Sequence, residues 1–135
     1  MTAPCQLIEL PVRRDDRGAL AFAESGKQVP FEVRREFHLF ELRYGVARGG
    51  HAHKACHQFL VAMAGEFSVT TDDGSKQSRW DLTSPSHGLH VPPGHWVELT
   101  PLCDGAVLSV LSSHGYYEAD YIRDRDQFIR NVQPS

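Results

Sequence analysis

The strongest constraint on the fold is how often turn residues interrupt the apolar segments of this chain. Its 11 glycines and 8 prolines leave apolar runs of only a few residues between them. Such runs are too short for most helices but match the usual length of β-strands. The run QFLVAM at 58–63 is apolar almost throughout, and EFSVTT at 66–71 alternates. This spacing predicts an all-β fold, either an antiparallel sandwich or a small barrel.

Some segments carry more specific expectations. We expect residues 31–43 to form a strand that is buried on both faces, because few polar residues interrupt its apolar pattern. The sequence DDG at 72–74 predicts a hairpin with a type I′ turn. Near the C-terminus, Asp124 is placed to cap a short helix that packs through Phe128, Ile129 and Val132. The other expected strands are 5–10, 19–23, 80–82, 89–91, 96–99 and 106–111.

Length and composition narrow the class of protein. A chain of 135 residues with 41% apolar content fits one domain spanning residues 1–135. Its net charge of −3 argues against a general nucleic-acid binder. The three cysteines lack CxxC spacing and fit a reduced, cytoplasmic protein, in which Cys56 and Cys103 are small buried residues. No signal-like run is found at the N-terminus, and no apolar stretch approaches the roughly 18 residues of a membrane span.

The most informative residues are His51 and His53. They are two positions apart, so strand periodicity directs both imidazoles to one face of a sheet. Arg48 and Lys54 flank them and could hold an anionic group such as a phosphate. Two facing imidazoles can bind a metal, transfer protons near neutral pH, or fill the interior as hydrogen-bonded residues. The two cationic neighbours favour a functional site.

The spacing around this pair resembles the first motif of the cupins, a superfamily of small β-barrels or jelly rolls. In that motif, as here, a glycine precedes HxH by five residues and a second glycine closes the segment. Metal-binding cupins add a glutamate from this first motif and a histidine from a second motif. This chain has Gln58 and Val97 at those two positions. Two imidazoles alone are a poor ligand set for a transition metal, so we expect none. His57 and His95 are the nearest candidates for a replacement ligand.

A closer resemblance covers almost the whole chain. The cupin-fold 3,4-ketoisomerases that act on dTDP-4-keto-6-deoxyglucose carry an HAHK motif and a DYIR ending, in the order and spacing found here. The matching segments are DDRG at 15–18, RGGHAHK at 48–54, DDG at 72–74 and YYEADYIR at 116–123. This chain departs from the family at Phe37-His38, where the family often has two tyrosines, and at Val97, where it usually has histidine.

The resemblance implies a cytoplasmic isomerase of deoxyamino-sugar biosynthesis that needs no cofactor. A base would remove the proton at C3 of a dTDP-linked 4-keto-6-deoxy sugar, and the enediol would be reprotonated at C4. We expect His53 to move the carbon proton and His51 the oxygen protons, and the exchanged assignment stays open. The residues expected to contact the sugar nucleotide are Arg17, Arg48, Lys54, Trp96, Glu98 and Arg123.

Each expected contact has a structural alternative. The arginines and Lys54 could be solvated surface residues, Trp96 a core residue and Glu98 a surface carboxylate. Tyr121 and Arg123 could bind nucleotide or attach the C-terminal segment to the barrel. The resemblance also implies a homodimer that exchanges the strand at 5–10. Two rival functions remain: a metal-dependent cupin enzyme and a non-catalytic module that binds sugar nucleotides.

Overall fold

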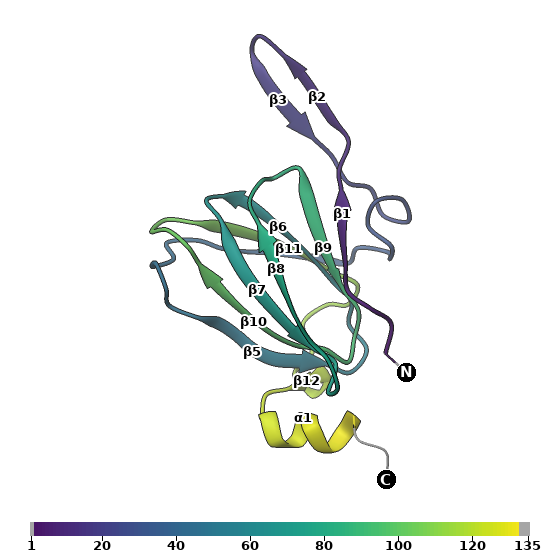
Figure 1. Ribbon diagram of the computed structural model, residues 1–135. Coiled ribbons are helices and arrows are strands. Elements are labelled where there is room, and N and C mark those ends of the chain that lie inside the picture. Colours follow the sequence, from purple (N-terminus) through teal and green to yellow (C-terminus); the bar gives the residue numbers. More distant parts are fainter. Residues whose placement is uncertain (1, 133–135) are drawn as a thin grey trace.

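The computed structural model describes residues 2–132, and within them the chain forms two five-stranded sheets, a separate hairpin and a C-terminal helix (Figure 1). All pairs between the strands are antiparallel. The elements are β1 (Gln6–Glu9), β2 (Val12–Asp15), β3 (Gly18–Ala21), β4 (Arg35–Leu39), β5 (Arg48–His53), β6 (Gln58–Ala64), β7 (Phe67–Asp72), β8 (Gln77–Leu82), β9 (His87–Val91), β10 (Trp96–Pro101), β11 (Val107–Ser112), the 3₁₀-helix η1 (Glu118–Asp120), β12 (Tyr121–Ile122) and α1 (Arg125–Val132).

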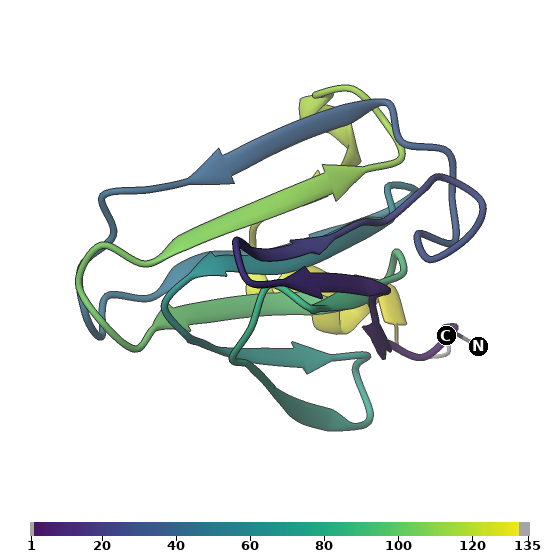
Figure 2. The same cartoon turned by 90° about the horizontal axis from the view of Figure 1, so that it is seen from above.

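The two large sheets form a jelly-roll sandwich. The first has the strand order β1-β9-β6-β11-β4 and the second β12-β5-β10-β7-β8. Figure 2 shows β4 and β11 side by side in the first sheet. The hairpin β2–β3 projects from the body beyond β1 (Figure 1). The predicted all-β jelly roll with a short C-terminal helix is thereby confirmed.

The main core lies between the two sheets. Alternate residues of a strand point to opposite faces, so every second apolar side chain enters this layer. Leu60 from the first sheet and Val69 and Leu99 from the second belong to it. A separate cluster around Phe59 covers the outer face of the first sheet. This arrangement explains why the first five residues of β6, which is apolar on both faces, are all buried.

Helix α1 covers the outer face of the second sheet near β5 and β10. Its Phe128 is fully buried against Ala52 and Trp96. The Asp124 side chain caps the helix, because its Oδ1 accepts hydrogen bonds from the backbone N–H of Asp126 at 2.8 Å and of Gln127 at 3.2 Å. The predicted cap and packing side are confirmed, and they attach the chain that follows β12 to the back of β5.

Three local expectations are wrong. Residues 31–43 contain only the short edge strand β4, whose residues alternate between half-buried and exposed, because no element covers the outer face of a strand at this edge. The hairpin after β7 has a four-residue loop instead of a type I′ turn: Gly74 has φ 97, but Asp73 lacks the positive φ that this turn requires. Cys103 is exposed, whereas Cys56 is buried as expected.

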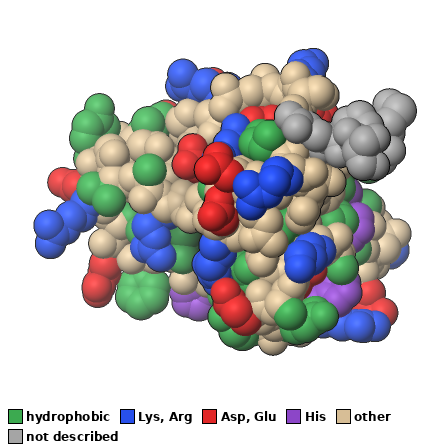
Figure 3. All heavy atoms as spheres, turned by 90° about the horizontal axis from the view of Figure 1, so that it is seen from below, with side chains coloured by type: hydrophobic (Ala, Val, Ile, Leu, Met, Phe, Trp, Pro, Cys, Tyr) green, Lys and Arg blue, Asp and Glu red, His purple; other side chains and the backbone are tan. Residues whose placement is uncertain are grey.

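The surface carries no dominant charge. On the face that Figure 3 shows, acidic and basic side chains alternate without gathering into a single patch. This mixture agrees with the small net charge of −3. Within residues 2–132, no helix combines the length and the apolar character needed to cross a bilayer.

Candidate active site

The site begins with a bulge in β5. Strict alternation would send Arg48 and His51, three residues apart, to opposite faces of the sheet. In the structure Arg48 lies opposite Leu99 and His51 lies opposite Val97, so Gly50 is an extra residue in the ladder with β10. Because Val97 and Leu99 both point inward, the bulge aims Arg48 and His51 into the same space.

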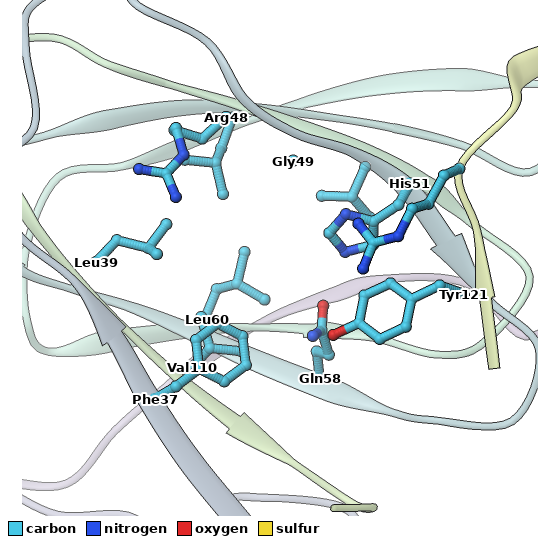
Figure 4. Close-up of a pocket in the computed structure, with 12 residues that line it drawn as sticks. Phe37, Leu39, Arg48, Gly49, His51, Gln58, Leu60, Val110 and Tyr121 are labelled. Carbon is cyan, nitrogen blue, oxygen red and sulfur yellow. The ribbon is translucent and has the colours of Figure 1, made fainter. Parts of the chain in front are cut away.

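That space is a cavity of about 240 Å³ between the inner faces of the two sheets (Figure 4). Pockets that enclose drug-sized ligands are usually about 300–1,000 Å³, so this one fits a sugar-sized group and leaves the rest of a larger ligand outside. Its apolar wall comes from Phe37, Leu39, Leu60, Val97, Leu99 and Val110. Its polar side chains are Arg48, His51, Gln58, Tyr121 and Arg123.

His51 lines the cavity, and His53 lies behind it. The two rings meet edge to face with their centroids 5.0 Å apart, and the Tyr121 ring lies 5.1 Å from His51 and 4.4 Å from His53. Burial, together with the neighbouring His53 and Arg123, lowers the pKa of His51 from 6.5 to about 4. The His51 imidazole is therefore neutral at pH 7 and free to accept a proton.

Asp120 orients His53. Its carboxylate is 5% exposed and accepts hydrogen bonds from His53 Nδ1 at 2.8 Å and from the backbone N–H of Ala55 at 2.7 Å and Cys56 at 3.3 Å. Burial raises the pKa of Asp120, but these hydrogen bonds outweigh it and the net pKa is lowered. An ionised carboxylate only accepts hydrogen bonds, so the His53 proton sits on Nδ1 and the lone pair on Nε2. Within residues 2–132, that buried Nε2 has no hydrogen-bond partner.

Sequence reasoning missed Asp120 as a site residue. It treated the residue only as part of the YYEADYIR segment. Asp120 is recognised as a site residue only from the pairing of β12 with β5. This pairing places Tyr121 opposite His53 and brings Asp120 close to His53. That pairing joins residues separated by 67 positions, and no local pattern predicts it.

Arg123 closes the mouth of the site in contact with Tyr121 and Glu118. Its guanidinium lies 4.2 Å from the centroid of the Tyr121 ring, and it makes a two-pronged ion pair with Glu118 at 2.7 and 3.0 Å. Tyr116 also donates its hydroxyl proton to Glu118. The ion pair with Arg123 lowers the pKa of Glu118 to about 2. These contacts hold a cation at the entrance, where an anionic ligand would meet it.

Four of the residues predicted to bind substrate lie outside the cavity of this chain. Arg17 is exposed on the projecting hairpin and pairs with Asp15. Trp96 and Glu98 point to the outer face of β10, since they alternate with the inward Val97; Trp96 packs on α1 and Glu98 is exposed. Lys54 lines a groove beside α1 on that outer side. For Trp96 and Glu98 the structural alternatives describe the observed positions.

The positions that departed from the family fall on different sides of the sheets. Phe37 lines the cavity, whereas His38 is exposed and lies 3.2 Å from the carboxylate of Glu36. Val97 occupies the cavity wall directly opposite His51. The wall beside the neutral His51 imidazole is therefore apolar at this position.

The residues at the cupin metal positions do not supply a metal site of the cupin type. Gln58 and Val97 replace two of the four ligands, and Val97 offers no donor atom. His95 lines a different pocket and bonds to the Pro92 carbonyl, while His57 bonds to His90, so neither is a replacement ligand. His53, Cys56 and Asp120 lie close enough to share an ion, but Asp120 already accepts three hydrogen bonds.

Comparison with known proteins identifies relatives over nearly the whole chain. Residues 3–133 match the family described as FdtA: WxcM-like, C-terminal. A TDP-4-oxo-6-deoxy-alpha-D-glucose-3,4-oxoisomerase of Aneurinibacillus thermoaerophilus is 40% identical over 118 residues, which cover 87% of this chain and 85% of that protein.

Solved structures agree in fold and length. A 3,4-ketoisomerase from Helicobacter canadensis is 34% identical and superposes with a TM-score of 0.91, covering 95% of this chain and 96% of that one. A mutant of the 3,4-ketoisomerase QdtA from Thermoanaerobacterium thermosaccharolyticum, in complex with TDP-4-keto-6-deoxyglucose, is 30% identical with a TM-score of 0.92. That match covers 98% of this chain and 96% of the QdtA chain.

Proposed function

Because this chain belongs to the FdtA-like family of cupin-fold sugar-nucleotide 3,4-ketoisomerases, we propose that it converts TDP-4-keto-6-deoxyglucose into a TDP-3-keto-6-deoxyhexose. The observation that carries this proposal is the neutral His51, which lines a sugar-sized cavity directly in front of the His53–Asp120 pair. A neutral imidazole is the form that can take a proton from carbon. The other polar cavity residues suit a sugar with several oxygens.

The reaction moves two protons and no net electrons. The C3–H bond breaks and its proton passes to the base, while the electron pair forms a C3–C4 double bond and the C4 carbonyl oxygen gains a proton. The O3–H bond of this enediol then breaks, C3 becomes the carbonyl, and C4 takes up a proton. Acid–base groups supply every step, since substrate and product are isomers.

We assign the carbon proton to His51 and the oxygen protons to His53, which exchanges the roles expected from the sequence. His51 lines the cavity, whereas His53 Nε2 is buried behind His51 and Tyr121. The Tyr121 ring packs against His53 and lines the cavity, and within residues 2–132 the buried His53 Nε2 has no hydrogen-bond partner, so proton exchange between His53 and the sugar requires a water or a substrate group beside Tyr121. Arg48 and Arg123 hold the anionic nucleotide, because both cations line the cavity.

Incubation with TDP-4-keto-6-deoxyglucose in deuterated water, followed by NMR, tests this function. We expect a 3-keto product with deuterium at C4, and the side of C4 that carries it gives the configuration of the product. A His51→Asn variant should bind TDP but form no product. No deuterium uptake together with no 3-keto product would remove the ketoisomerase assignment, whereas a 3-keto product without deuterium would show that His51 returns the C3 proton to C4 without exchange with solvent.

We also propose that the enzyme is a cytoplasmic homodimer that exchanges β1. In this single chain β1 is an edge strand paired only with β9, and an exchanged β1 would make the same four pairings with β9 of a second copy. An apolar groove of about 630 Å³ between the hairpin and the first sheet, lined by Met63, which is 54% exposed, is a surface for such a copy. The three free cysteines suit a reducing compartment. A monomer in light scattering after size exclusion would contradict the dimer.

A further inference from the structure

Gln58 is a buried polar residue that the acid–base mechanism leaves unused. It is the first residue of β6, is 6% exposed and lines the cavity. Figure 4 shows its carboxamide pointing into the part of the cavity that His51 and Tyr121 also face, with Arg48 farther away. No hydrogen bond to another protein group is found for its side chain within residues 2–132, and its amide atoms are not among the fully enclosed polar atoms without a partner, so they face the open cavity.

A ligand that fills the cavity displaces water from this amide and must replace its hydrogen bonds. A ligand group that left the amide unpaired would lose affinity. The neighbouring wall offers little compensation, since Phe37, Leu60 and Val110 are apolar. Within residues 2–132, Ser112, opposite Gln58 on β11, has a buried hydroxyl without a hydrogen-bond partner. A polar ligand is therefore the partner for which this end of the cavity is built.

The reacting part of the substrate under the proposed function is a carbonyl next to a hydroxyl, that is, an acceptor beside a donor. A carboxamide is the neutral side chain that offers an NH₂ donor and a carbonyl acceptor in one plane. It can bind both oxygens at once, and after isomerisation a half-turn of the amide matches the reversed pattern. While the enediolate forms, the NH₂ group donates to the oxygen that gains charge.

We propose that Gln58 is a catalytic residue that binds O3 and O4 of the sugar and stabilises the enediolate between them. This inference rests on the proposed ketoisomerase function. It gives the cavity a donor for the developing negative charge, a role that the neutral His51 cannot fill while it is accepting the carbon proton. It also gives a role to a polar side chain that stands beside the apolar Phe37, Leu60 and Val110.

Two substitutions separate this role from simple packing. Gln58→Met keeps the length of the side chain but removes both hydrogen-bonding groups, and Gln58→Glu keeps the shape but replaces the donor by a negative charge. We expect kcat to fall about 10²- to 10³-fold in both, as when one donor to a developing oxyanion is removed. The affinity for TDP, which lacks the sugar, should stay within about twofold. Gln77→Glu, the same change on the exposed side of β8, is the control.

A kcat within threefold of wild type for Gln58→Glu would overturn the proposal, provided that the wild-type protein forms product. If the wild-type protein forms no product, the proposed ketoisomerase function itself has failed. The wild-type activity therefore distinguishes failure of the function from failure of the role proposed for Gln58. If both variants fail to fold, NMR of the wild-type side-chain amides decides. The Gln58 NH₂ signals should move with the 4-keto sugar nucleotide and not with TDP alone, and unmoved signals would refute the contact.

Discussion

Replacing Asp120 by asparagine tests the buried pair behind the cavity. Oδ2 of Asp120 accepts from His53 Nδ1 and the Cys56 N–H, and Oδ1 accepts from the Ala55 N–H. An asparagine must place its NH₂ group against one of these two sets of donors. Each placement leaves at least one buried donor without an acceptor, at roughly 1–3 kcal/mol per donor, and it also removes the negative charge. We expect the free energy of unfolding to fall by about 2–4 kcal/mol.

The effect on activity should exceed what this loss of stability explains. With asparagine, His53 can carry its proton on either nitrogen, so the tautomer needed for proton transfer is no longer fixed. We expect kcat to fall between about 10²- and 10⁴-fold, while TDP affinity stays within about twofold. NMR of the 4-keto substrate measures the rate, and urea unfolding measures the stability.

Asp81→Asn is the matched control, because Asp81 is exposed on β8 and pairs only with Arg79. It should leave both measurements unchanged. An Asp120→Asn variant that lost the expected stability but kept kcat within threefold of wild type would contradict the orienting role of Asp120. Asp120 would then only hold the backbone at residues 55 and 56.

Four further outcomes follow from the structure. Phe128→Ala should lower the free energy of unfolding by about 3–4 kcal/mol in urea titration, because the ring is fully buried between α1 and the sheet. Arg123→Lys should raise KM about tenfold with little change in kcat, since lysine keeps the charge but lacks the planar guanidinium group that makes two parallel hydrogen bonds. The acid limb of kcat/KM should fall near pH 4 instead of 6.5, because burial lowers the pKa of His51 to about 4, and a midpoint near 6.5 would contradict this. Burial, with neighbouring His57, also lowers the pKa of His90 from 6.5 to about 4. The unfolded chain then binds more protons between these values, so urea unfolding should show stability falling from pH 6.5 to 4, with up to ~3 kcal/mol from each of His51 and His90. The fall should be smaller in His90→Gln.

The sequence predicts the parts of the fold that depend on neighbouring residues. The alternation at 66–71 and the apolar run at 58–63 match β7 and β6, because periodicity reports directly which faces are covered. Asp124 and Phe128 likewise identify α1. The prediction that residues 31–43 form a strand buried on both faces was wrong, because apolar composition does not show whether another element covers a strand. The position of β4 at a sheet edge depends on the topology of the whole chain.

The residues of the site also differ in whether local patterns or distant contacts place them. Two-residue spacing correctly places His51 and His53 on one face, opposite to the outward Ala52. It does not predict the bulge at Gly50, which turns Arg48 inward as well. Nor does it predict Asp120, because that contact depends on a two-residue strand that returns from the far end of the chain. Residues that act through long-range pairing are therefore the ones that local patterns miss.

The charges around His51 connect binding to catalysis. In the empty site, burial, His53 and Arg123 lower the pKa of this imidazole, so it is unprotonated and ready to act as a base. A base with so low a pKa is weak, however, and removal of a proton from carbon requires a stronger one. A bound diphosphate beside Arg123 would offset that cation, and an enediolate beside His51 would stabilise the imidazolium. Both charges raise the pKa of His51 only when the substrate is in place, so the base gains strength at the stage of the reaction that uses it.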